Sequence, residues 1–234
     1  MTAAERAWVQ KLAPYRNADD RQAVVEIVLT LVPFVGVWTA MYALMSVSYW
    51  FTLLLVPLAA CLMVRLFIIQ HDCGHRALFS SRKTNNWVGR FMGVLTMTPY
   101  ECWRYAHALH HAGSGNLDKR GFGDIETLTI SEYNDLKPLN KFWYRLYRNP
   151  LILFVLGPAY LFIVRHRFPL WALSLGREQW ISIMATNISI AVLYAVIIYF
   201  IGLTAFLMIQ IPVVALGASI GVWLFYVQHQ YDTT

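Results

Sequence analysis

Two long apolar blocks constrain the fold of this chain more than any other feature. Residues 24–64 contain one charged side chain, Glu26, and residues 182–227 contain none. A membrane-spanning helix needs about 20 consecutive apolar residues, so each block is too long for one span and suits two. Breaks near residues 46–49 and at Gly202 would turn each block into a helical hairpin. The predicted spans are approximately residues 24–45, 50–69, 182–201 and 204–227.

The fold class that follows is all-α. We predict an integral membrane protein with four transmembrane helices, arranged as a single domain over residues 1–234. The region between the hairpins is basic and aromatic, and it is predicted to form cytoplasmic or interfacial helices. Within it, Leu151–Val164 is an apolar run of only 14 residues that contains Gly157 and Pro158. This run is short for a span and favours an interfacial or re-entrant segment.

The positive charges are distributed in a way that indicates topology. The chain has 19 Lys and Arg against 13 Asp and Glu, and no Lys or Arg lies beyond Arg177. Such a bias is typical of cytoplasmic segments of membrane proteins, so it argues against nucleic-acid binding as the origin of the net charge. The amino terminus, the middle region and the segment after Val227 are predicted to share the cytoplasmic side.

Five of the seven histidines fall between residues 71 and 111. His71 and His75 are spaced i and i+4, which places both on one face if the preceding span continues as a helix. His107 has His110 at i+3 and His111 at i+4, the same spacing on a second helix. Neutral imidazole is a ligand for Fe, Zn, Cu and Ni. The two arrays therefore predict a metal site at one face of the membrane.

The number of candidate ligands points to two metal ions. His229 follows the fourth span directly, and the predicted topology returns it to the face that carries the other arrays. Six imidazoles exceed the three or four protein ligands of a single zinc site. His166 lies between two arginines and is read as an ordinary packed or surface residue. Cys73 is two residues from each histidine of the first array, so on a helix it points elsewhere.

Two further readings concern the membrane surface and the spans. Six aromatic residues are predicted to be interfacial anchors. They are Trp87, Trp103, Trp143, Tyr144, Tyr147 and Trp171. A membrane metal transporter would place ionisable residues within its spans. The predicted spans are nearly free of them, which weighs against transport.

The order of these elements resembles the membrane fatty acid desaturases of the bacterial acyl-lipid type. The segment His71–His75 matches the HxxxH box of that family, and His107–His111 matches its HxxHH box. The segment Phe225–Gln230 resembles the stretch that precedes the third box. HxxxH alone is a weak signal, but two spans, two boxes and two further spans in this order are specific.

The resemblance implies an O₂-dependent desaturase that removes two vicinal hydrogens from an acyl chain of a membrane lipid. It implies two iron ions, an electron donor such as ferredoxin or cytochrome b5, and a bacterial inner membrane with the boxes on the cytoplasmic side. Asp72, Asp118 and Asp124 are candidates to orient the imidazoles. An acidic donor would dock near Arg145 and Arg148. The implied metal ligands are His71, His75, His107, His110, His111 and His229.

Two alternatives remain at this point. A hydroxylase or ketolase of the same histidine-box superfamily would use the same kind of site. The family also carries a third box, HxxHH, after the last span, and this chain has no such motif before its end at Thr234. We therefore expect a truncated sequence with impaired metal binding, and an inactive remnant is the corresponding alternative.

Overall fold

A computed structural model describes residues 3–12, 17–113, 116, 118, 125–168 and 175–228 of the chain. These residues form helices, turns and extended segments, and no strand occurs among them. The helices, in chain order, are α1 (Ala3–Leu12), α2 (Asp20–Leu44), α3 (Tyr49–Gly74), α4 (Arg82–Leu95), α5 (Tyr100–Gly113), α6 (Ile130–Asp135), α7 (Pro138–Tyr147), η3 (Ile152–Leu156), α8 (Gly157–Tyr160), η4 (Leu161–Arg165), α9 (Arg177–Ile201) and α10 (Leu203–Gln228).

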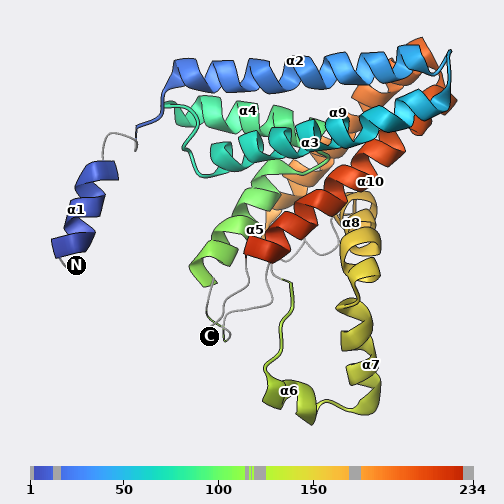
Figure 1. Ribbon diagram of the computed structural model, residues 1–234. Coiled ribbons are helices and arrows are strands. Elements are labelled where there is room, and N and C mark those ends of the chain that lie inside the picture. Colours follow the sequence, from blue (N-terminus) through green and yellow to red (C-terminus); the bar gives the residue numbers. More distant parts are fainter. Residues whose placement is uncertain are drawn as a thin grey trace.

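The four predicted spans are confirmed as α2, α3, α9 and α10, each long and apolar enough to cross a membrane. The first hairpin turns at residues 45–48, and the second turns at Gly202, whose φ of 82° suits a residue without a Cβ atom. Both turns lie at the same end of the bundle (Figure 1). Helix α3 continues past the predicted end at residue 69 and reaches Gly74, so the first histidine array belongs to the span itself.

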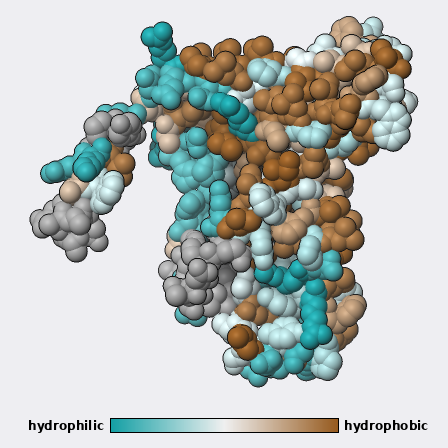
Figure 2. Space-filling view, viewed as in Figure 1, coloured by the Kyte–Doolittle hydropathy of each residue, from teal (hydrophilic) through white to brown (hydrophobic). Residues whose placement is uncertain are grey.

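Helix α3 is the centre of the bundle and packs against α2, α4 and α10. The main core cluster joins α2, α3 and α10, and a second cluster joins α3 to α4. The first cluster consists of Met41, Val56, Ala59, Met63, Ile209 and Val213, and the second of Leu66, Ile69 and Met92. Apolar residues also cover the outer surface of the spans (Figure 2), as expected where lipid replaces water.

Helices α4 and α5 lie at the end of the bundle opposite the hairpin turns (Figure 1). Helix α4 is amphipathic and inserts its buried face, which includes Gly89, Met92 and Gly93, against α3 and α9. Helix α5 begins beside α3 and α9 and then leaves the bundle. The second histidine array therefore lies on a helix that is anchored at its amino-terminal end.

Residues 125–147 form an arm that projects from the bundle (Figure 1), whereas η3 and α8, which follow, pack against α10. A capping box at Thr129 and Glu132 begins α6. Helix α7 and the following segment Ile152–Arg165 are bent by 60° relative to each other, and together they are long and apolar enough for one broken span or a re-entrant loop. The predicted re-entrant or interfacial run, Leu151–Val164, coincides with this second segment, which includes two short π-helices.

Candidate metal centre

The first histidine array lies where α3 ends. His71 is in the last turn, and His75 is the C-cap residue. The helix closes with a Schellman motif, in which Ala77 N donates to Asp72 O at 3.0 Å and Arg76 N donates to Cys73 O at 3.0 Å. Arg76 has a φ of 59° at the position that glycine usually takes. Both imidazoles lie next to the ring of His107 on α5, with centroids 4.8 Å away for His71 and 5.0 Å away for His75.

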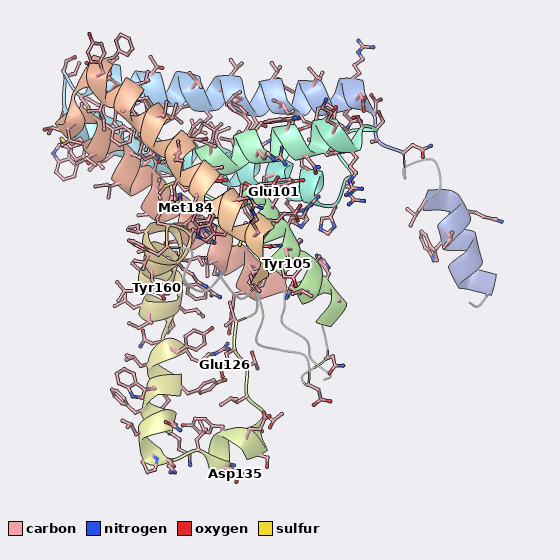
Figure 3. All side chains as sticks on the ribbon, turned by 180° about the vertical axis from the view of Figure 1, so that it is seen from behind. Glu101, Tyr105, Glu126, Asp135, Tyr160 and Met184 are labelled. Atoms are coloured by element: carbon pink, nitrogen blue, oxygen red, sulfur yellow. The ribbon has the colours of Figure 1, made fainter. Side chains whose placement is uncertain are left out.

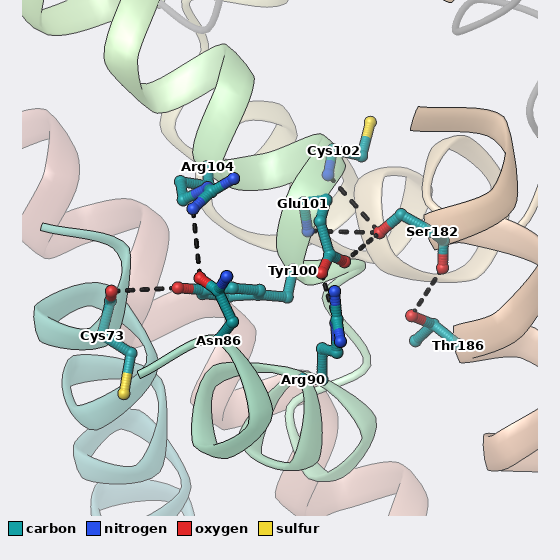
Figure 4. A network of polar contacts seen from close by, with 9 residues as sticks. All are labelled: Cys73, Asn86, Arg90, Tyr100, Glu101, Cys102, Arg104, Ser182 and Thr186. Carbon is teal, nitrogen blue, oxygen red and sulfur yellow. Dashed lines mark hydrogen bonds and ion pairs between the residues drawn. The ribbon is translucent and has the colours of Figure 1, made fainter. Parts of the chain in front are cut away.

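The second array is fixed by the way α5 begins. Pro99 precedes the helix and has no side chain that could cap it. Ser182 of α9 takes that role, because its hydroxyl accepts from Glu101 N at 3.2 Å and from Cys102 N at 3.5 Å. The Glu101 carboxylate also pairs with Arg90 of α4 and accepts from Ser182 at 3.1 Å. Figure 4 shows this network, and Figure 3 labels Glu101 on the whole chain.

The two arrays converge on one point. His71, His75, His107 and His111 each offer a ring nitrogen, and these four atoms lie within 4.8 Å of one another. His75 Nε2 is 3.2 Å from His71 Nε2 and 3.0 Å from His107 Nε2. His107 Nε2 is also 3.0 Å from His111 Nε2. We call these four residues the histidine cluster.

A metal ion accounts for these distances better than hydrogen bonds do. A ring Nε2 carries either one proton or one lone pair in its plane, so it can form only one good hydrogen bond there. His75 and His107 each have two such neighbours. Ligands at about 2.0–2.1 Å from a common ion lie roughly 3.0–3.4 Å apart, which matches the three short separations between neighbouring nitrogens of the cluster. The donor set therefore fits a transition metal.

The surroundings of the cluster favour the neutral form of His75 and His107. Burial lowers the pKa of His107 to about 3, and the charged forms of the neighbouring histidines lower it further in the same direction. Partial burial, with His71 and His111 nearby, also lowers the pKa of His75. A metal ion requires the unprotonated nitrogen. The lowered pKa values of His75 and His107 therefore leave their ring nitrogens free to bind a cation.

One of the three candidate acids lies beside the cluster. Asp72 Oδ1 is 3.1 Å from His71 Nδ1, so the carboxylate can hold the proton on Nδ1 and leave Nε2 free to bind a metal. Asp118 donates its backbone N–H to Asn116 Oδ1 at 2.9 Å. Asp124 lies outside the described residues.

The remaining histidines occupy other positions. His110 is 5% exposed, and its ring lies between the cluster and the end of the fourth span. The centroid of the ring is 5.2 Å from that of Phe225 on α10, 5.7 Å from that of His111 and 6.2 Å from that of His107. The predicted ligand His229 lies outside the described residues. His166 packs against Phe162, with ring centroids 5.2 Å apart, and does not belong to the histidine cluster.

Trp103, predicted as an interfacial anchor, also packs against the histidine cluster. Its ring stacks on His107, with centroids 4.6 Å apart and an interplanar angle of 18°. A Cβ on Gly74 would lie 2.8 Å from the Trp103 ring. The glycine of the first box therefore leaves the space that the Trp103 ring occupies. The signal in the sequence was the i, i+4 spacing of Trp103 and His107, which places both on one face of α5.

Fold and site together define a class of protein: an α-helical integral membrane protein whose histidine cluster, at the end of a span, can hold a metal ion. Comparison with known proteins then gives the family. The sequence model of the fatty acid desaturase family matches residues 48–234 of this chain. The chain therefore belongs to the fatty acid desaturase family.

Individual relatives agree with this assignment. A fatty acid desaturase of Bacillus subtilis is 40% identical over 228 residues, which are 97% of this chain and 64% of that protein. The sn-1 acyl-lipid omega-3 desaturase (ferredoxin) of Synechocystis is 33% identical over 131 residues, or 53% of this chain and 35% of that enzyme. The sn-1 oleoyl-lipid 12-desaturase of Picosynechococcus is 32% identical over 111 residues, or 47% and 31%. No solved structure matches.

Proposed function

We propose that this protein is an O₂-dependent acyl-lipid desaturase that introduces a C=C bond into a fatty acyl chain. The chain spans 64% of the Bacillus relative and smaller shares of the cyanobacterial ones, and the activity is proposed for the whole protein. The observation that carries the proposal is the histidine cluster, which brings two family motifs from separate helices to within bonding distance of one ion.

We assign the metal centre to two iron ions. The histidine cluster would hold the first ion, since its four nitrogens already converge. His110, which faces the end of α10, and His229, which follows α10, would contribute to the second. When bound, the iron ions activate O₂ for the oxidation of an unactivated C–H bond, a reaction that no side chain can perform alone.

The residues of this chain have three tasks in that chemistry. The lowered pKa values of His75 and His107 keep both imidazoles unprotonated and able to bind metal near neutral pH. Asp72 fixes the tautomer of His71. Trp103 fixes the ring plane of His107 by stacking and shields one side of the cluster from water.

The substrate and topology follow from where the cluster lies. It is at the end of α3, a helix long and apolar enough to cross a membrane, and we propose that acyl chains reach it from the bilayer. The names of the cyanobacterial relatives describe acyl-lipid and oleoyl-lipid substrates. The excess of Lys and Arg before Arg177 favours the cytoplasmic face, and we place the protein in a bacterial inner membrane.

The electron donor is proposed to be a ferredoxin or a cytochrome b5-type protein, and a ferredoxin appears in the name of the Synechocystis relative. Arg145 remains a suitable docking residue because it is exposed on α7. Arg148 is less suitable, since it donates to the Tyr226 hydroxyl at 3.2 Å and supports the end of α10. Charge reversal at Arg145 is therefore the cleaner test of docking.

The experiment is a total fatty-acid profile of a host that expresses the protein, beside hosts that express His107→Ala or the surface variant Tyr199→Phe. We expect a new unsaturated acid from the first and third hosts and none from His107→Ala. A hydroxylated product instead would indicate the hydroxylase alternative. Equal product from His107→Ala and the parent would refute the role of the histidine cluster, and no product from the parent would contradict the proposed activity.

A further inference from the structure

Tyr100 connects the two histidine arrays. It is the first residue of α5, and it is 1% exposed. Its hydroxyl donates to the backbone carbonyl of Cys73 at 2.9 Å (Figure 4). Cys73 lies midway between His71 and His75 in the sequence. The hydrogen bond therefore runs from the start of the second box helix to the middle of the first box.

The ring of Tyr100 is closely packed and has little room to move. A Cβ on Gly89 of α4 would lie 2.3 Å from Tyr100 Cε2, so only glycine permits this approach. The guanidinium of Arg104 lies over the ring, 5.6 Å from its centroid, and is itself bonded to Asn86 of α4 at 3.2 Å. A ring fixed from two sides gives its hydroxyl a defined position relative to α4 and α5.

The acceptor is a group that sets the end of α3. Cys73 O also accepts from Arg76 N, the bond that closes the Schellman motif. A carbonyl oxygen has two lone pairs, and Tyr100 takes the second one. Burial raises the pKa of Tyr100 to about 12, so the hydroxyl stays a donor at working pH. The Tyr100–Cys73 hydrogen bond thus joins the end of α3 to α5 beside the first pair of histidines.

We propose that Tyr100 is a positioning residue that sets the separation of the two histidine arrays and thereby the affinity of the cluster for metal. The proposal rests on the metal centre described above. Metal–nitrogen distances tolerate deviations of only about 0.2 Å, so a small shift of α3 relative to α5 weakens binding. Groups that orient ligands in this way typically affect metal affinity by 10–100-fold.

The test uses Tyr100→Phe, which keeps the ring and removes only the hydroxyl. Tyr199→Phe is the matched control, because Tyr199 is 84% exposed on α9. The purified chain in detergent is titrated with Co²⁺, and the visible ligand-field bands and the melting temperature are recorded. For Tyr100→Phe we expect roughly tenfold weaker Co²⁺ binding with shifted bands. We expect the control to match the parent.

A second measurement separates this proposal from the metal centre itself. Hydrogen–deuterium exchange of the metal-free chain should be faster over residues 73–77 in Tyr100→Phe and unchanged in Tyr199→Phe. If the parent binds no Co²⁺, the proposed metal centre fails, and the exchange result alone then supports or overturns the positioning role. If the parent binds Co²⁺ and Tyr100→Phe binds it equally well with the same bands, the proposal is overturned, even if the melting temperature falls.

Discussion

Two regions differ in how they are held: the helix ends around the histidine cluster, and the arm, residues 125–147. Around the cluster, side chains from α3, α4, α5 and α9 bond to one another, and Tyr100, Met92 and Asn85 are almost fully buried. In the arm, α7 has no buried residue. Its exposed apolar side chains recur at i, i+3, i+4 and i+7. These side chains are Leu139, Phe142, Trp143 and Leu146.

This difference teaches where the chain needs fixed geometry. A metal site requires several ligands within tenths of an ångström. The first box lies at the end of α3, and the second lies on α5, whose amino-terminal end neighbouring helices hold in place. The arm makes local contacts, such as the bonds from Glu126 N and Leu128 N to the hydroxyls of Tyr147 and Tyr144. Regions with few buried contacts open more readily. Changes of equal chemical size should therefore have unequal effects in the two regions.

The largest effect is expected from His107→Ala, because His107 Nε2 is 3.0 Å from two other ligand nitrogens. We expect Co²⁺ affinity to fall by at least about 100-fold, since a lost ligand costs more than a lost orienting group. Trp143→Ala in the arm should leave the affinity within about twofold of the parent. Isothermal titration of both variants checks this. Similar losses of Co²⁺ affinity in His107→Ala and Trp143→Ala would contradict the proposed difference between the cluster and the arm.

The next effect concerns glycine packing. Gly89→Ala forces a Cβ into the Tyr100 ring, whereas Gly36→Ala on α2 meets no atom within 4 Å. Overpacking of this kind costs about 1–3 kcal/mol. For a chain of this size the melting temperature should fall by roughly 3–10 °C. Gly36→Ala should not lower it. Equal melting temperatures for the two variants would show that the Tyr100 ring is not closely packed against Gly89.

A smaller effect is expected from pH. The pKa of His107 is about 3 in the folded protein, against an ordinary 6.5. Between pH 6.5 and pH 3, His107 is therefore protonated in the unfolded chain and neutral in the folded protein. The free energy of unfolding of the metal-free protein should be constant above pH 6.5 and decrease as the pH falls below it. Since His107 is only partly buried, we expect a loss of about 2–4 °C in melting temperature between pH 7 and pH 5.

That pH effect should be localised. The arm contains no histidine, so its hydrogen exchange, corrected for the intrinsic pH dependence, should not change between pH 7 and pH 5. Residues 71–77 and α5 should exchange faster at pH 5. A melting temperature that is the same at both pH values would contradict the lowered pKa of His107.

The smallest effect on the fold is expected from Arg145→Glu in the arm. Arg145 is exposed and bonds to the Tyr133 hydroxyl, so stability should change by no more than about 0.5 kcal/mol. Co²⁺ affinity should not change. Reduction by a ferredoxin should slow several-fold at low salt and less at high salt, because rim charges act mainly on association. Stopped-flow reduction at two salt concentrations measures this, and an unchanged rate would exclude docking at Arg145.

The sequence predicted the fold class and the histidine arrays because both depend on local patterns. Spans follow from uninterrupted apolar runs, and the i, i+4 spacing of His71 and His75 follows from helix geometry. Trp103 and Tyr100 were missed as parts of the site. An aromatic residue near a membrane face is equally compatible with an anchor, and only its neighbours in space distinguish the two roles.

By itself, the sequence determined that this chain has four helices that can span a membrane and carries histidine boxes at the end of one span. The tertiary structure alone decided that four of the histidines meet at one point while His110 turns toward α10. It also decided that Ser182, Gly89 and Tyr100 fix the helix that brings them there. The physical reason is range: periodicity acts within one helix, whereas a metal site depends on contacts between helices that are far apart in the chain.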